Sequence, residues 1–386
     1  QEQRQERRQE DRQENRQEQR QERRQEQTQQ QREEQRKQQQ ERREERRAQE
    51  RRNERQDDRQ DQRQGRQIDN LRQQTREMRQ EFEQKEREER RQAERRAQNR
   101  EVINRDNGRV VIREGDRIIV RSDDMSRFRR NSRDFNIDRL DDGRRRVTTV
   151  RNDGVRIVTV YDARDRIVSR TRVRDGRETY LIDNRRFNRG NDAIINFRNV
   201  LPPLVIGIPQ NEYILDSRGA SRAQIEETFL APPVEVIERP YSLEEVRYSE
   251  RLRDKVRRID IDAIHFATGS DEVASDQLAA LDNIADAIMD ILDERPDEIF
   301  LIEGHTDAVG SDLSNLELSD RRAESVAAAL SEDYGIPPEN LVTQGYGEED
   351  LKVETESASA ENRRVTMRRI TPLLDANAGS GGDAPQ

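Results

Sequence analysis

The stretch that decides the fold is FLIEGHTDAVG at residues 300–310, followed by SDRRAESVAAALSEDY at residues 319–334. The first begins with three apolar residues and passes into a polar run containing glycine, which predicts a buried strand that ends in a loop at Asp307. In the second, apolar residues recur at the three- and four-residue spacing of an amphipathic helix. We expect Ser319 to cap this helix and Gly335 to end it. A buried strand leading into such a helix indicates an α+β domain.

The neighbouring segments extend this unit in both directions. An apolar pattern predicts a strand over residues 259–266, and Ser275 begins a helical pattern that stops before Pro296. Downstream, the apolar runs at 341–344 and 365–370 predict two more strands. The resulting order, βαβαββ, describes a small sheet with two helices, so the predicted fold class is α+β.

Two residues of opposite charge are expected at one crevice of this scaffold. Asp307 follows the carboxyl end of the buried strand. Arg322 falls in the first turn predicted for the next helix, where amides near Ser319 add hydrogen-bond donors. A carboxylate binds an ammonium group, and a guanidinium binds a carboxylate through two parallel hydrogen bonds. The pair therefore suits a zwitterionic ligand. Without the surrounding motifs, Asp307 would be interpreted as a turn residue and Arg322 as a solvated helix residue.

Several spaced motifs in this segment resemble the signature of the OmpA-like C-terminal domain family, a peptidoglycan-binding module also seen in Pal lipoproteins and flagellar MotB. The motifs are GHTDAVG at 304–310, Asn315, LSDRRA at 318–323, Val326, GYGE at 345–348 and NRRV at 362–365. The resemblance covers residues 259–371. It implies noncovalent binding of the diaminopimelate residue of the peptidoglycan stem peptide, with Asp307 and Arg322 as principal contacts. It also implies a pocket lined by Thr306, Ala308, Asn315, Leu318 and Arg364.

Other residues of this segment have plainer interpretations. Glu303 is predicted to point to the opposite face of the sheet from Ile302 and to form a salt bridge, and His305 to be a structural residue at the strand end. Residues 363, 368 and 369 are arginines, which we interpret as a basic edge. Residues 351–353 stand where the family often has a proline-containing segment, so the shape of that loop is left open.

Composition weighs against an enzyme or a metal site. The chain has no Cys and two His, which excludes thiolate catalysis and makes a zinc site improbable, so neither metal nor cofactor is predicted. A wall-degrading hydrolase would need two carboxylates across a cleft, and no pair is singled out by spacing. We therefore expect a non-enzymatic protein of the periplasm, associated with the outer membrane of a Gram-negative cell. The alternative is a structural tether or motor-coupling protein resembling MotB or Pal, although the chain has no apolar run of 18 residues.

The first hundred residues differ in composition from the rest of the chain. They contain 31 basic and 26 acidic side chains, 29 Gln and only seven apolar residues, so they cannot build a core. Glu and Arg each recur every four residues from residue 2 to residue 26, which aligns like charges along a helix. We interpret residues 1–100 as a low-complexity polyampholyte spacer, disordered or helical. Residues 68–82 carry two heptads of apolar spacing, a short coiled-coil signal.

Residues 101–198 are predicted to form an antiparallel β region. An eleven-residue unit repeats from Asp142 to Arg185, and its members begin near Asp-Gly, or near Asp165 in the third. Asp-Gly pairs between apolar runs are typical of hairpin turns, so we predict a meander, preceded by a hairpin through residues 110–112 and 118–120.

The remaining segments are a connector and a tail. Residues 199–258 contain six prolines and two short helical signals, capped at Ser221 and Ser242, and residues 372–386 are predicted to be disordered. By segment, the formal charge is +5 for residues 1–100, +8 for 101–200 (25 basic, 17 acidic) and −22 for 201–386 (17 basic, 39 acidic).

The nearly cancelling charges of residues 1–100, and their single aromatic residue, argue against nucleic-acid binding by this segment. The N-terminal or β region is left open as a contact for an envelope protein, and the sequence does not determine the oligomeric state. A chain that begins at Gln1 is compatible with a processed product or a fragment.

Overall fold

The computed structural model describes most of the chain between residues 66 and 374. The described positions are 23, 34, 37–38, 40–43, 46, 49, 66, 68–106, 108–114, 117–187, 195–262, 264, 266–267 and 269–374. Two compact units are distinguished, residues 1–78 and 79–386, and each is considered by itself. Apart from residue 23, the predicted tetrad repeat lies outside the described residues, as do residues 375–386 of the predicted tail.

The described positions of the first unit are all helical. Ile68, Leu71 and Met78 of the heptad pattern are exposed, by 51%, 64% and 63% of their surface. The coiled-coil signal therefore has no apolar partner among the described residues of this unit, and it stays a prediction.

The second unit begins with helical residues 79–97, which are held to the rest of the unit. Phe82 is half-buried against a hydrophobic cluster. Glu86 pairs with Arg239 at 2.8 Å, and Glu89 accepts a hydrogen bond from the Asn199 side chain at 3.0 Å. This part of the predicted spacer is thus an integrated helix.

The β region is antiparallel throughout, which confirms the predicted meander. The first sheet has the order β1-β2-β3 and the second the order β4-β5-β6-β7-β8, separated by helix α2. Its elements are β1 (Arg100–Asp106), β2 (Arg109–Glu114), β3 (Arg117–Ser122), α2 (Met125–Arg130), β4 (Asp134–Arg139), β5 (Arg145–Val150), β6 (Arg156–Tyr161), β7 (Ile167–Arg174) and β8 (Arg177–Asp183).

The turns of the meander follow the eleven-residue repeat. Gly143, Gly154 and Gly176 all have positive φ, and Asp165, which replaces glycine in the third repeat, adopts φ 63°. Asp tolerates the left-handed conformation better than most residues do, so the register of the repeat survives the substitution.

The connector consists of short elements, and both predicted helix caps are present, each as a capping box. At Ser221 and at Ser242 the side chain accepts a hydrogen bond from the N3 amide, while the N3 side chain bonds back to the cap. The elements are α3 (Phe197–Val200), α4 (Gln210–Tyr213), β9 (Ile214–Asp216), α5 (Arg222–Leu230), α6 (Leu243–Tyr248) and α7 (Glu250–Arg253).

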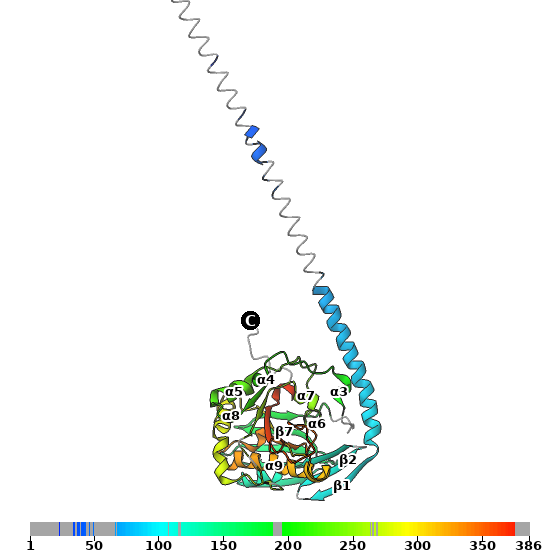
Figure 1. Ribbon diagram of the computed structural model, residues 1–386, viewed down its shortest axis with the longest axis vertical. Helices are drawn as coiled ribbons and strands as arrows, with labels where there is room; N and C mark the ends of the chain where they lie inside the picture. Colours follow the sequence, from blue (N-terminus) through cyan, green and yellow to red (C-terminus); the bar gives the residue numbers. More distant parts are fainter. Residues whose placement is uncertain are drawn as a thin grey trace, which may run out of the picture. The chain divides into compact units, whose positions relative to one another are not determined.

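The C-terminal part has the predicted βαβαββ order. Figure 1 draws this part in yellow to red and labels its helices α8 and α9. The sheet order is β12-β11-β13-β10-β9, so the connector contributes the edge strand β9, which the sequence did not indicate. One face of the sheet packs on the two main helices, with Ile288, Ile302 and Val326 in the core. The elements are β10 (Arg258–Asp260), η1 (Ser275–Leu281), α8 (Asp282–Glu294), β11 (Phe300–Gly304), α9 (Asp312–Glu332), η2 (Pro338–Asn340), β12 (Leu341–Gly345), β13 (Val365–Arg369) and α10 (Thr371–Leu374).

Element boundaries differ from the prediction at four places. Helix α9 begins at Asp312, where the Ser311 hydroxyl caps it by accepting from the Ser314 amide at 3.3 Å. Ser319 therefore lies inside the helix, and the prediction that it caps the helix is wrong. Strand β10 ends at Asp260, and residues 275–281 form a 3-10 turn before α8. The predicted tail began at residue 372, whereas α10 includes Leu373, which is fully buried.

Candidate functional site

Asp307 lies in the loop after β11, held between two other loops. The amide of His305 donates to the carbonyl of Arg364 at 2.9 Å, and the amide of Thr306 donates to the carbonyl of Gly347 at 2.8 Å. These bonds continue the sheet pairing past the end of the strand. The Asp307 carboxylate is consequently placed where the three segments meet, as predicted from its position after the strand.

The Asp307 carboxylate already has partners within the chain. Its Oδ2 forms an ion pair with Arg363 at 2.7 Å and accepts a hydrogen bond from the Ser359 amide at 3.3 Å. Its Oδ1 accepts from the Val309 amide at 3.4 Å. Neither Arg363 nor Ser359 was predicted as a site residue.

Arg322 is a buried guanidinium that contacts carbonyl oxygens. It donates to the carbonyls of Ser270 at 3.0 Å, Ala267 at 3.4 Å and His305 at 3.5 Å, and its guanidinium carbon lies 4.9 Å from the centre of the Phe266 ring. Within the described ranges no carboxylate forms an ion pair with it. Burial and the neighbouring Arg363 lower its pKa to about 10, with Asp307 acting in the opposite direction. The group is therefore a cation at neutral pH that carries no salt bridge.

Close backbone contacts bring Arg322 to the strand end. A Cβ at Gly304 would overlap the carbonyl oxygen of Ser319, and one at Gly345 would overlap the amide nitrogen of Asp320. The Ser319 hydroxyl accepts from the Gly347 amide at 2.8 Å and donates to the Leu316 carbonyl at 2.8 Å. Since the Ser319 amide belongs to an internal turn of α9, the predicted free amide donors at this point are not available.

The other residues predicted to line the pocket are spread around Asp307. Asn315 donates through its side-chain amide to the Asp307 carbonyl at 3.3 Å and to Glu348 at 2.7 Å. Thr306 is buried, and its hydroxyl has no hydrogen-bond partner among the described residues. Ala308 and Leu318 are half-buried.

Arg364 points elsewhere. Its guanidinium donates to the carbonyl of Asp350 at 2.9 Å, and burial together with Arg258 lowers its pKa to about 10. The structure therefore brings Arg363, and not Arg364, to Asp307. A two-residue period could have indicated this, because Val365 packs in the core beside α9 and Arg363 lies in phase with it.

The opposite face of the sheet carries a buried network of charges. Glu303 pairs with Arg253 at 2.8 Å and with Arg368 at 3.1 Å, which confirms its predicted salt bridge. On the helix-packed face, to which Val365 and Met367 belong, Arg369 pairs with Glu298 at 2.7 Å and donates to the carbonyl of Phe229. Residues 368 and 369 are 2% and 3% exposed, so the prediction that they form a basic surface edge is wrong.

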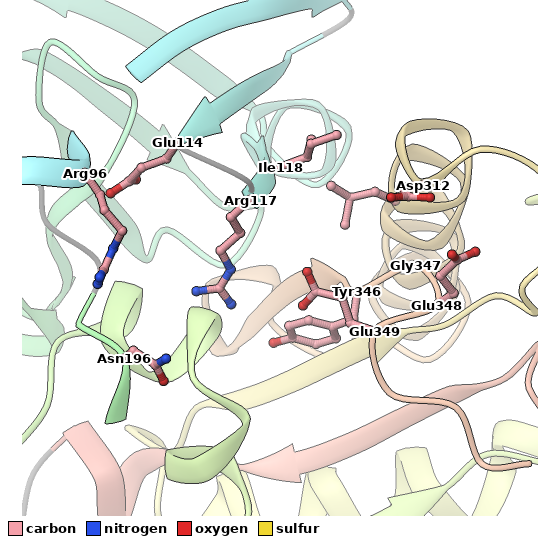
Figure 2. Close-up of a pocket in the computed structure, with 11 residues that line it drawn as sticks. Arg96, Glu114, Arg117, Ile118, Asn196, Asp312, Tyr346, Gly347, Glu348 and Glu349 are labelled. Carbon is pink, nitrogen blue, oxygen red and sulfur yellow. The ribbon is translucent and has the colours of Figure 1, made fainter. Parts of the chain in front are cut away.

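A cavity of about 530 Å³ lies next to the Asp307 loop (Figure 2). Figure 2 shows Arg96 and Arg117 on one side and Asp312 and Glu348 on the other. None of the predicted site residues lines this cavity, although Glu348 links it to Asp307 through Asn315. The lining residues are Arg96, Glu114, Arg117, Ile118, Asn196, Asp312, Leu316, Tyr346, Gly347, Glu348 and Glu349.

Two other kinds of feature are missing from the part of the chain that the structure describes. No three His, Cys, Asp or Glu side chains come together there in a way that could hold a metal ion. No described helix has the length and apolar character needed to cross a membrane.

Comparison with known proteins finds a family match in the C-terminal part. Residues 265–364 match the model of the OmpA family, which confirms the resemblance for that segment. Outer membrane porin F of Pseudomonas aeruginosa is 32% identical over 124 residues, which cover 32% of this chain and 33% of that protein. Outer-membrane lipoprotein YfiB of the same organism is 35% identical over 104 residues, or 26% of this chain and 59% of the lipoprotein. The chain thus spans about a third of the porin and under two thirds of the lipoprotein.

Solved structures also align with this part. The peptidoglycan-associated lipoprotein from Burkholderia pseudomallei is 29% identical and covers 27% of this chain and 86% of its own, with a TM-score of 0.24. The periplasmic domain of Helicobacter pylori MotB, residues 90–256, is 22% identical and covers 30% of this chain and 75% of its own, with a TM-score of 0.25.

Proposed function

We propose that this protein binds peptidoglycan noncovalently in the cell envelope, without catalysing a reaction, and that Asp307 and Arg322 take the zwitterionic side chain of diaminopimelate. One observation carries the proposal. Arg322 is a fully buried guanidinium whose hydrogen-bond acceptors among the described residues are all carbonyl oxygens, and Asp307 lies near enough to oppose the lowering of its pKa. A buried cation without an anion is costly, and a ligand carboxylate would supply the anion.

The comparisons support the setting of this proposal. The match to the OmpA family covers both Asp307 and Arg322. The relatives described above are named as an outer membrane porin and an outer-membrane lipoprotein. These names support the envelope as the setting, and we propose that the C-terminal part acts at the periplasmic face of the outer membrane.

Sedimentation with purified sacculi tests the site. We expect the wild-type protein to sediment with sacculi, and Asp307→Asn and Arg322→Ala each to weaken binding by about 2–5 kcal/mol, because each leaves one charge of the bound ligand without a partner. Arg321→Gln is the matched control, since Arg321 lies beside Arg322 but pairs at the surface with Asp271 at 3.3 Å. Undiminished sedimentation of the Asp307→Asn/Arg322→Ala double variant would show that ligand binds elsewhere.

The same experiment addresses the alternative of a wall-degrading hydrolase. An enzyme would release soluble muropeptides from the sacculi, and we expect the supernatant to contain none above the level of a buffer control. A structural tether resembling MotB or Pal would use the same binding site and would need a second attachment in addition.

A further inference from the structure

One flank of helix α9 is covered by the β region. Leu316, Asp320 and Glu324 recur at four-residue spacing, so they lie along one stripe of the helix. Each has a partner in β2, β3 or α2, and these elements precede residues 265–364, the segment that matches the family model. The helix that carries Arg322 is therefore held from outside the matched segment. The contacts are Leu316 in a hydrophobic cluster with Val111 and Val120, Asp320 with Arg109 and Ser122, and Glu324 with Arg127.

The Asp320 carboxylate is bound by both strands of the β2–β3 pair. Its Oδ2 accepts a hydrogen bond from Arg109 Nε at 2.7 Å, and its Oδ1 accepts one from the Ser122 hydroxyl at 3.0 Å. Arg109 and Ser122 stand directly opposite each other in the register of the two strands. Asp320 is fully buried, so opening this clamp of Arg109, Ser122 and Asp320 would leave a buried carboxylate without its cation. The clamp consequently fixes one flank of α9 to the β region.

Asp320 and Arg322 lie on opposite flanks of α9. Ser319 faces the sheet, since its carbonyl oxygen and its hydroxyl lie against Gly304 and Gly345. At about 100° per residue, Asp320 is turned about 100° to one side of Ser319 and Arg322 about 60° to the other. The glycine contacts set how closely the helix approaches the sheet, whereas a bond on one flank opposes rotation of the helix about its axis. The clamp therefore holds the flank that does not carry Arg322.

The hydrogen bonds of Arg322 itself hold its guanidinium only weakly. Of its three carbonyl acceptors, that of Ser270 lies at 3.0 Å, and the other two lie at 3.4 and 3.5 Å, which is long for an N–H donor. Neither bond of the clamp is longer than 3.0 Å. Because the guanidinium ends a long side chain, a small rotation of α9 would move it further than it moves the backbone. The placement of this group therefore depends on what fixes the rotation of the helix.

We propose that Arg109 and Ser122 are positioning residues for wall binding, because they hold Asp320 and thereby fix the rotation of α9 that places Arg322 near Asp307. The inference rests on the proposed function and adds that affinity for peptidoglycan depends on the β2–β3 pair. Both residues act through the helix and without touching the ligand. Charge-assisted bonds require the correct distance and direction, so a small misplacement of Arg322 lowers affinity.

Sedimentation of the full chain with purified sacculi tests the positioning role. We expect Arg109→Met to weaken binding about tenfold, because α9 loses a bond that fixes its rotation. Arg109→Lys should bind nearly as well as the wild type, since one charge-assisted bond joins Arg109 to Asp320 and an ammonium can form it. Ser122→Ala removes only the longer of the two bonds, and we expect a loss of about threefold.

Two controls separate positioning from a general loosening of the fold. Glu339→Gln disrupts buried ion pairs of the same interface beside the first residue of β12, at the end of that strand away from Gly345. It should lower stability and leave the affinity for sacculi unchanged. Arg113→Met changes a neighbouring arginine of β2 whose side chain is 53% exposed and pairs with Glu101 at 3.8 Å, and it should alter neither property. Circular dichroism establishes that each variant is folded at the temperature of the assay.

The outcomes distinguish this inference from the proposed function. Wild-type binding by Arg109→Met, or an equal loss of binding in Arg109→Met and Glu339→Gln, would overturn the positioning role. If Arg109→Met does not fold, Ser122→Ala decides, and wild-type binding by that variant would overturn the role. The proposed function fails separately, if the Asp307→Asn/Arg322→Ala double variant sediments as the wild type does. Loss of binding in the double variant together with full binding by Arg109→Met would remove this inference alone.

Discussion

Glu303 illustrates how one buried charge is maintained in this protein. Burial opposes its ionisation, but Arg368 and Arg253, together with a hydrogen bond from the Thr366 hydroxyl at 2.8 Å, outweigh that effect and lower its pKa to about 2. A carboxyl with a lowered pKa binds its proton more weakly in the folded state than in the unfolded state. Its contribution to stability is therefore present above the unfolded pKa and is lost as the pH falls towards about 2.

This residue supplies a pH-dependent prediction. Glu303→Gln should lower the free energy of unfolding by about 3 kcal/mol at pH 7, because Arg253 and Arg368 are buried and each loses one of its two carboxylate partners, Asp350 and Asp254 being the others. The difference between wild type and variant should shrink as the pH falls from 4.5 towards 2. Urea denaturation at pH 7 and pH 3 measures it, and an equal difference at both values would contradict the assigned ionisation.

The arginine pair 363 and 364 shows where residue-level prediction reached its limit. The motif resemblance implied Arg364 as a pocket residue, whereas Arg363 contacts Asp307 in the structure. Neighbouring residues in an extended segment point to opposite faces. Which face meets α9 depends on the pairing of β13 with β11, and a motif does not encode that pairing.

At the scale of elements, helix α9 connects the site to the sheet. It lies so close to β11 and β12 that Gly304 and Gly345 leave no room for a side chain. The close approach of α9 to β11 and β12 fixes the position of Arg322 relative to the ends of these strands. The position of the guanidinium is consequently a property of how the helix packs, and the glycines determine that packing.

Gly304→Ala tests this arrangement. The added methyl group would push α9 away from the sheet, so we expect a loss of stability of about 3 kcal/mol or more and weaker binding to sacculi. Gly207→Ala is a matched control, because nothing lies within 4 Å of a Cβ there. Thermal unfolding and sedimentation report the two effects. Wild-type stability in Gly304→Ala would mean that α9 can shift at little cost.

At the scale of the second unit, the charge asymmetry of the sequence becomes an internal interface. Arginines of the basic β region pair with carboxylates of the acidic C-terminal part, and apolar residues of the meander share one cluster with Leu301 and Val342. The pairs and distances are Arg109–Asp320 at 2.7 Å, Arg127–Glu324 at 2.6 Å, Arg151–Glu339 at 2.9 Å and Arg172–Glu339 at 3.3 Å. The sequence left the β region open as a surface for a partner protein. Several of its arginines instead form ion pairs with the C-terminal part of the same chain.

Glu339 is the residue to change at this interface. It is fully buried between Arg151 and Arg172, so Glu339→Gln should destabilise the unit by about 3 kcal/mol. We expect the β region and the C-terminal part to unfold together in one calorimetric transition in both proteins. Glu354→Gln is the control. It changes an exposed loop residue and should leave the stability of the unit unchanged. Two separate transitions in the wild type would show that the interface does not couple the two parts.

The sequence alone determined the features that depend on local pattern. The βαβαββ order, the meander with its Asp-Gly turns and the helix caps at Ser221 and Ser242 all follow from short-range periodicity and turn chemistry. The location of Asp307 could be predicted because a loop residue that follows a buried strand has a predictable place. The start of α9 was misplaced, because Ser319 looks like a helix cap in the sequence, while the turns before it bury the polar Asn315 beside Leu316.

Tertiary structure decided whatever depends on contacts between distant segments. The strand β9, the partner of Asp307 and the burial of Arg368 and Arg369 arise from segments far apart in the chain. The sequence showed that basic and acidic residues are concentrated in different segments. It did not show that these segments form ion pairs with each other. An ion pair forms only when folding brings both groups within a few ångströms, and composition records the charges without recording their distances.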